Sequence, residues 1–134
     1  MVGQIGRDMQ GQNLDDVVDR IRHLGGANIR FVMLYGSHAE EREMPISDID
    51  IAVYYWASAE GRFQFRMNIA GSLSSRYDVH IFQDLPLHVR KDVISHGEIL
   101  YQKDYVETFN IFLQTIREYE DFKPRLDIYY EGLR

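Results

Sequence analysis

Two apolar segments joined by a polar one constrain the fold more than any other feature of this sequence. Residues 29–35 are predicted to form a buried strand that stops abruptly at Gly36 and Ser37. Ten residues, most of them polar, follow Ser37, and a second strand is predicted over residues 49–56. A Gly-Ser pair therefore closes one strand, and an acidic segment opens the next.

That acidic segment contains Asp48 and Asp50. Residues two apart on a strand point to the same side, so the two carboxylates are expected to converge on one face, opposite Ile49 and Ile51. Like charges held this close repel each other unless a cation lies between them or one carboxylate is protonated. Mg²⁺ suits such a pair because it prefers oxygen ligands. On its own, however, Asp-x-Asp is typical of a solvated strand start.

The Gly-Ser pair offers a complementary chemistry. Glycine adopts backbone angles closed to other residues and lets a ligand approach the main chain, which predicts such a role for Gly36. Ser37 opens a predicted helical turn, where its hydroxyl and free N–H groups would suit a phosphate. Most Gly-Ser pairs are ordinary turns, so this feature gains weight only from its position before the aspartates.

The remaining pattern predicts an α/β fold, a small mixed β-sheet with flanking helices. The expected elements are a helix from Asn13 to a stop at Gly25, a helix over 60–76, a strand over 77–82, a short helix over 86–95, a small strand over 98–101 and a final aromatic-rich helix. An Asp104–Glu107 capping box is expected to begin the final helix. Pro124 is expected to kink or end it near Phe122.

The strand predicted over 77–82 carries a third acidic candidate, Asp78. By alternation Asp78, His80 and Phe82 share a face. None of the five histidines shows metal-ligand spacing, and only His80 is placed so that it could line a pocket with Asp78. A lone aspartate at a strand start is ordinarily a turn residue, so Asp78 matters through its combination with the other acids.

Composition narrows the function classes. The 134 residues suit one domain, expected over 13–134 with a flexible tail over 1–12, and contain no cysteine for a disulfide or a thiolate metal site. The net charge of −6 makes nucleic acid a poor partner, because phosphate-backbone binding needs a basic footprint. No apolar run approaches the roughly 20 residues that span a bilayer, and residues 1–12 lack a signal peptide. A cytoplasmic protein is expected.

Gly-Ser, ten residues, then Asp-x-Asp is the signature of the DNA polymerase beta-like nucleotidyltransferases, and the chain resembles that superfamily. From about residue 14 it is similar to the small MNT-domain proteins, in particular MntA-type antitoxins paired with HepT-type HEPN toxins. Two later features extend the resemblance. One is Asp78, which follows the second strand, and the other is the last helix, which contains Tyr119 and Pro124.

The resemblance implies a protein that uses Mg²⁺, two ions in the expected mechanism, to transfer AMP from ATP to a tyrosine of the toxin. It implies metal-binding and catalytic roles for Asp48, Asp50 and Asp78. It also implies nucleotide binding by Gly36 and Ser37. The partners implied are a HEPN-type toxin and a nucleoside triphosphate, with no membrane.

One departure leaves alternatives open. Relatives read Gly-Ser-x-Ala-Arg-Gly, whereas this chain has Glu40 and Glu41 at the last two positions, and Arg42 is the nearest residue that could turn toward a triphosphate. An antitoxin that neutralises its toxin by binding alone therefore remains an alternative. A transferase for a small molecule or an RNA end is a third, weakened by the acidic charge and by the lack of a second domain for the acceptor.

Overall fold

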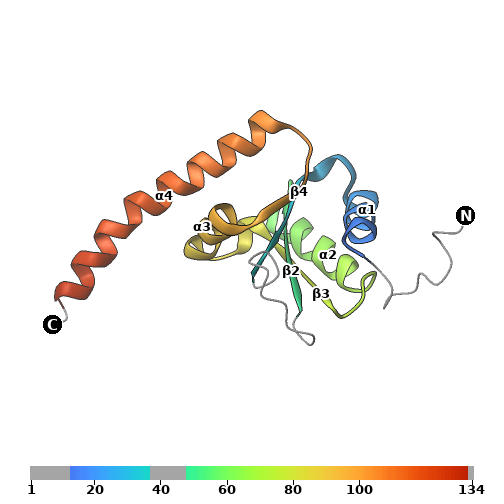
Figure 1. Cartoon of the computed structure of the whole chain (residues 1–134), viewed down its shortest axis with the longest axis horizontal. Coiled ribbons are helices and arrows are strands. Elements are labelled where there is room, and N and C mark those ends of the chain that lie inside the picture. Colours follow the sequence, from blue (N-terminus) through green and yellow to red (C-terminus); the bar gives the residue numbers. More distant parts are fainter. Residues whose placement is uncertain (1–12, 37–47, 133–134) are drawn as a thin grey trace, which may run out of the picture.

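The structure, a computed structural model, describes residues 13–36 and 48–132, with side chains as far as residue 123 (Figure 1). Its elements in chain order are α1 (Leu14–Gly25), η2 (Gly26–Asn28), β1 (Ile29–Tyr35), β2 (Ile49–Tyr55), α2 (Ala59–Ala70), β3 (Tyr77–Ile81), η4 (Phe82–Asp84), α3 (Leu87–His96), β4 (Glu98–Gln102) and α4 (Tyr105–Gly132).

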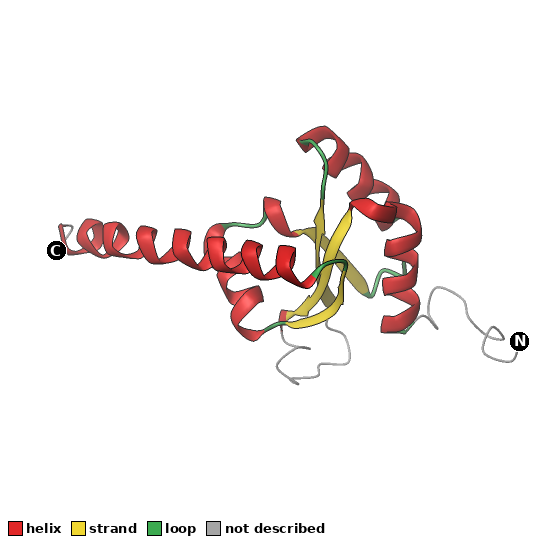
Figure 2. Cartoon of the chain, turned by 90° about the horizontal axis from the view of Figure 1, so that it is seen from above, coloured by secondary structure: helices red, strands yellow, loops and turns green. Residues whose placement is uncertain are grey.

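The four strands form one mixed sheet in the order β3-β2-β1-β4. β1 is antiparallel to both β2 and β4, whereas β2 and β3 are parallel. Parallel neighbours need a long crossover connection, and α2 supplies it between β2 and β3. The expected small mixed sheet with flanking helices is thus confirmed (Figure 2).

Helices pack on both faces of this sheet. On one face Ile21 of α1 and Phe65 of α2 belong to the same buried cluster as Ile51 of β2. On the other face Val93 of α3 packs in a second buried cluster with Phe31 of β1. Because successive strand residues point to opposite faces, Val32 and Leu34 of β1 belong to the first cluster and Phe31 and Met33 to the second.

Local signals explain where α1 begins. The Asn13 side chain accepts a hydrogen bond from the backbone N–H of Asp16 at 2.9 Å, and the Asp16 carboxylate accepts one from the N–H of Asn13 at 3.3 Å. This reciprocal capping satisfies two N–H groups that the first turn leaves free. The predicted start at Asn13 and the stop at Gly25 and Gly26 are confirmed.

Two boundaries differ from the prediction. The helix expected over 60–76 ends at Ala70, because Gly71 follows it and the chain turns, although Leu73 beyond the helix is still buried. The strand expected to include Phe82 ends at Ile81, and Phe82 begins η4. There its ring packs edge-on against Phe31 at 5.1 Å.

Pro124 was predicted to kink or end the last helix near Phe122; the helix does not end there, since α4 continues to Gly132. A proline removes one backbone hydrogen bond and crowds the preceding turn, at a cost of about 3 kcal/mol, yet a long helix can retain it. The first half of α4 packs against the sheet through Phe112, whose ring lies 5.4 Å from Phe31. The second half projects away from the body of the molecule (Figures 1 and 2).

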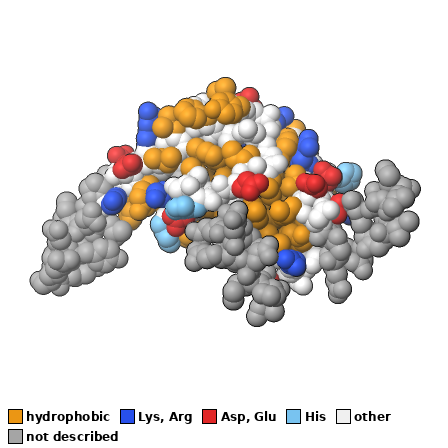
Figure 3. Space-filling model, in the orientation of Figure 1, with side chains coloured by type: hydrophobic (Ala, Val, Ile, Leu, Met, Phe, Trp, Pro, Cys, Tyr) orange, Lys and Arg blue, Asp and Glu red, His pale blue; other side chains and the backbone are white. Residues whose placement is uncertain are grey.

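The outer surface is mixed in character. Tyr105, Val106 and Phe109 in the first turns of α4 are more than half exposed. Figure 3 shows hydrophobic atoms of this kind interspersed with acidic and basic side chains on one face of the molecule. None of the described helices combines the length and the apolar character that crossing a membrane would require.

Candidate metal and nucleotide site

Asp50 and Asp78 lie next to each other on neighbouring strands. Asp50 is the second residue of β2 and Asp78 the second of β3, and the two are register partners in the parallel pair. Register partners point to the same face, and neighbouring strands are about 4.8 Å apart, so the two carboxylates lie side by side. Both project from the face that carries Ala52 and Phe31, opposite to the Ile51 face.

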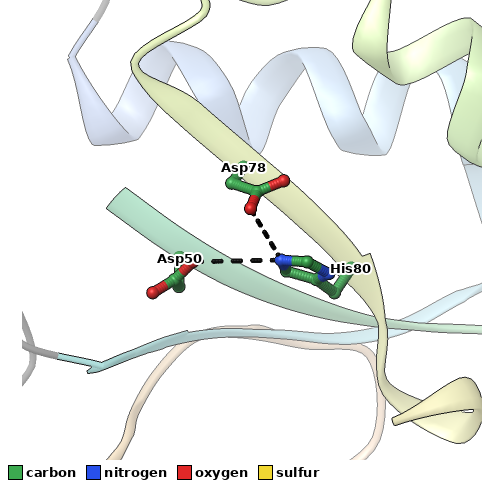
Figure 4. A group of neighbouring side chains, drawn as sticks. All are labelled: Asp50, Asp78 and His80. Carbon is green, nitrogen blue, oxygen red and sulfur yellow. Dashed lines mark hydrogen bonds and ion pairs between the residues drawn. The ribbon is translucent and has the colours of Figure 1, made fainter. Parts of the chain in front are cut away.

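His80 completes the group. It is two residues beyond Asp78 on β3 and therefore shares its face. Its Nε2 atom lies 2.9 Å from Oδ2 of Asp78, within hydrogen-bond distance, and 3.9 Å from Oδ1 of Asp50 (Figure 4). One ligand atom from each of the three residues falls within 4.8 Å of the others.

The three side chains are open enough to receive a ligand. The exposed fraction of the side chain is 34% for Asp50, 45% for Asp78 and 26% for His80. These values exclude a fully buried ion pair and leave a partly shielded site, where a bound ion could keep water and substrate oxygens in its shell. The donor set of two carboxylates and an imidazole suits a divalent cation.

Tyr35 forms the wall of the site on the β1 side. It is the register partner of Asp50 across the antiparallel β1–β2 pair, and its ring packs edge-on against His80 with centroids 6.2 Å apart. Burial, reinforced by the charges of Asp50 and Asp78, raises the pKa of Tyr35 above the ordinary 10.0, although Arg66 opposes the shift. The phenol is therefore neutral at physiological pH.

Gly36, directly after Tyr35, makes room for the Asp50 carboxylate. Its φ angle is +80°, a conformation that side chains with a Cβ rarely adopt. A Cβ at this position would lie only 2.7 Å from Oδ2 of Asp50. The glycine is thus required twice, by the backbone turn at the end of β1 and by the carboxylate beside it.

The structure brings some of the predicted site residues together. Gly36, Asp50 and Asp78 lie at one place, whereas Asp48 is exposed immediately before β2 and is not part of the three-residue group. Ser37 and Arg42 fall outside the described residues. So do the two acidic departures from the motif, Glu40 and Glu41.

The sequence pattern alone did not indicate that His80 lies within reach of both aspartates. His80 was expected only to line a pocket with Asp78, because its spacing from the other histidines excluded a histidine-based metal site. The available signal was its place two residues after Asp78 on the same strand, which puts both side chains on one face. What the sequence pattern did not contain was the register that brings Asp50 of β2 to the same place.

Sequence comparison finds relatives for most of the chain. The family model described as Polymerase beta, Nucleotidyltransferase matches residues 21–106. A Methanocaldococcus jannaschii protein, named "Putative protein adenylyltransferase MJ1547", is 28% identical over 95 residues, which are 71% of this chain and 73% of that protein.

Comparison with solved structures agrees. A chain of the crystal structure of a toxin–antitoxin with AMP-PNP matches with a TM-score of 0.72 at 17% identity, over 90% of this chain and 98% of that one. A chain of the Shewanella oneidensis complex of a tri-AMPylated HEPN toxin with an MNT antitoxin matches with a TM-score of 0.64 at 17% identity, over 87% and 92% of the two chains. At these identities the likeness shows a shared fold.

Proposed function

Because the chain belongs to the polymerase beta nucleotidyltransferase family, we propose that it is an antitoxin that transfers AMP from ATP to a tyrosine hydroxyl of a HEPN-type toxin. The observation that carries the proposal is the pairing of Asp50 with Asp78, which sets two carboxylates side by side next to Gly36. The relative named as an adenylyltransferase and the solved antitoxin complex with an AMPylated toxin support this donor and this class of acceptor.

In this proposal Asp48, Asp50 and Asp78 hold Mg²⁺. The residues fit the ion, because carboxylate oxygens are the ligands that Mg²⁺ prefers and because a carboxylate oxygen of Asp50 lies within 4.8 Å of one of Asp78. When bound, the metal would neutralise charge on the triphosphate and on the departing pyrophosphate.

Other residues would bind and orient the nucleotide. Gly36 leaves the backbone accessible at the end of β1, so a phosphate can approach the main chain there. Ser37 would donate its hydroxyl proton to a β- or γ-phosphate oxygen, and Arg42 would add a positive charge. These last two roles rest on the motif alone.

The transfer step conserves atoms and charge. The tyrosine oxygen of the acceptor attacks the α-phosphorus of ATP, and its proton passes to the Asp78 carboxylate. The bond between the α-phosphorus and the oxygen that bridges to the β-phosphorus breaks, and pyrophosphate leaves with that electron pair. The product is a phosphodiester that joins AMP to the tyrosine.

An antitoxin that only occludes its toxin is the second candidate. The observation that favours it is Glu40 and Glu41 in the motif, because a carboxylate beside a triphosphate costs electrostatic stabilisation. In that case the fold and the toxin complex would persist without transfer.

The test is the intact mass of the protein encoded by the neighbouring open reading frame, chosen if its sequence is of HEPN type, after incubation with this chain, ATP and Mg²⁺. We expect a mass gain of one or more AMP units with the wild-type protein and none with Asp48→Ala/Asp50→Ala. Asp19→Asn, an exposed acid on α1, is the matched control and should transfer AMP normally. A stable complex without a mass gain would replace the transferase with the binding-only antitoxin.

A further inference from the structure

We infer that His80 is a ligand of the metal site and that its imidazole makes the site favour transition-metal ions over Mg²⁺. The inference rests on the proposed function, because it concerns the same carboxylates. It adds a nitrogen ligand to a site whose other ligands are carboxylate oxygens. It predicts that Mn²⁺ binds to Asp50, Asp78 and His80 together.

The distances are those of atoms that can share one ion. Nitrogen and oxygen ligands lie about 2.0–2.2 Å from a metal such as Zn²⁺, so two ligands of one ion are at most roughly 4.4 Å apart. Nε2 of His80 is 2.9 Å from the Asp78 carboxylate and 3.9 Å from that of Asp50. Both separations fall inside that limit, so the imidazole is within reach of an ion that either carboxylate holds.

The strand positions hold the imidazole in this orientation. Figure 4 shows the ring of His80 on β3 turned so that one nitrogen faces Asp78 on its own strand and Asp50 on β2. The Tyr35 ring lies edge-on beside the imidazole, with the ring centroids 6.2 Å apart. With about a quarter of its side chain exposed, His80 is shielded but remains accessible to an ion from solvent.

The donor set decides which ion is preferred. Mg²⁺ takes hard oxygen ligands and demands near-ideal octahedral geometry, so it gains little from an imidazole. Mixed nitrogen and oxygen sites bind divalent transition metals, and Mn²⁺ accepts carboxylates and phosphate oxygens as readily as Mg²⁺ does. A nitrogen ligand should therefore raise the affinity for Mn²⁺ while changing that for Mg²⁺ much less.

The experiment uses Mn²⁺ as the probe, with the full chain and with inorganic triphosphate, which supplies phosphate oxygens but no nitrogen. Electron spin-echo measurements detect ¹⁴N coupled to bound Mn²⁺. We expect this modulation in the wild type and its loss in His80→Gln. His88→Gln, an exposed histidine on α3, is the matched control and should retain it. Titration should show that His80→Gln weakens Mn²⁺ binding by about 10-fold or more, on the scale of other perturbed metal sites.

Each other outcome overturns the inference. If Mn²⁺ binds in an Asp50-dependent way but shows no nitrogen coupling, or if the coupling persists in His80→Gln, then carboxylates alone hold the metal, His80 only orients Asp78, and the proposed transferase stands. If the wild type binds no Mn²⁺ with or without triphosphate, both the nitrogen ligand and the metal-dependent transfer fail. Circular dichroism of His80→Gln establishes that the fold is retained.

Discussion

The Asp50 carboxylate lies where a side chain of Gly36 would be: a Cβ at Gly36 would lie 2.7 Å from Oδ2 of Asp50. The end of β1 and the carboxylate of β2 therefore have to be considered as one unit. The turn leaves the space that the carboxylate fills, and any side chain added at the turn displaces a residue of the site.

Gly36→Ala should consequently damage both stability and chemistry. Backbone strain at its positive φ costs about 1–3 kcal/mol, and displacement of Asp50 should lower AMP transfer by at least about 10-fold. Gly26→Ala is the matched control, because Gly26 also has a positive φ of +58° but nothing lies within 4 Å of its Cβ position. Denaturant unfolding and a transfer assay should show a similar loss of stability for both variants and a loss of activity for Gly36→Ala alone. Equal activity of the two would contradict the contact with Asp50.

Asp78→Asn should abolish most of the activity without unfolding the chain. A positioned proton acceptor contributes about 10²–10⁴-fold to a rate, so the transfer rate should fall by that range. Because the substitution removes one of two neighbouring negative charges, the melting temperature in EDTA should be unchanged or higher. Mg²⁺ should raise the melting temperature of the wild type but not that of the variant, since only a protein that binds the ion is stabilised by it. A variant that Mg²⁺ stabilises as much as it does the wild type would remove Asp78 from the metal site.

Tyr35 should make the free energy of unfolding decrease at alkaline pH. Its folded-state pKa is raised above the 10.0 of a free tyrosine, mainly by burial. Above about pH 10 the unfolded chain releases this proton while the folded chain keeps it, so stability is fully present below pH 10 and is lost as the pH rises. The contribution is about 1.4 kcal/mol per pH unit until the folded-state pKa is reached.

Denaturant titrations at several alkaline pH values test this effect. The free energy of unfolding of Tyr35→Phe should fall less steeply above pH 10 than that of the wild type. Tyr105→Phe, which replaces a tyrosine that is 70% exposed, should follow the wild type. Parallel curves for all three proteins would show that Tyr35 does not carry the alkaline sensitivity.

Phe31 should be the residue that joins α4 to the sheet. Its ring is fully buried and lies 5.1 Å from Phe82 and 5.4 Å from both Tyr54 and Phe112. Phe31→Ala should lower the free energy of unfolding by about 3–5 kcal/mol, the usual cost of a large cavity. Phe109→Ala, on the exposed side of α4, should change it by no more than about 0.5 kcal/mol. A loss below 1 kcal/mol for Phe31→Ala would show that α4 packs independently of this cluster.

Much of the fold could be predicted because local signals determine it. Asn13 determines where α1 begins, and Gly25 and Gly26 determine where it ends. The apolar run over 29–35 coincides with β1. The length of α2 was overestimated because burial in the core imitated a helical pattern. Leu73 continues the apolar spacing of α2 because it is buried in the same core, not because it is helical. Pro124 is a different case: α4 retains it in its interior, in the half of the helix that projects away from the sheet, and no contact among the described residues explains why.

The site was only partly predictable. Alternation alone assigned Asp50 to a face of β2 and Asp78 to a face of β3. It could not reveal that β2 pairs with β3 in parallel, or that the register sets these two residues opposite each other. His80 comes close to Asp50 only through that pairing, whereas Tyr35 enters the site through the antiparallel pairing of β1 with β2. Asp48, which the spacing grouped most closely with Asp50, is exposed just outside β2.

The parallel pairing of β2 with β3 also determines when this site can exist during folding. All of α2 lies between Asp50 and Asp78 along the chain, so their carboxylates meet only after the crossover helix has closed a long loop and β3 has docked at the sheet edge. An ion that binds both carboxylates has affinity for the completed sheet and little for any earlier intermediate. A bound ion would therefore stabilise the pairing of β3 with β2 as well as take part in the proposed chemistry.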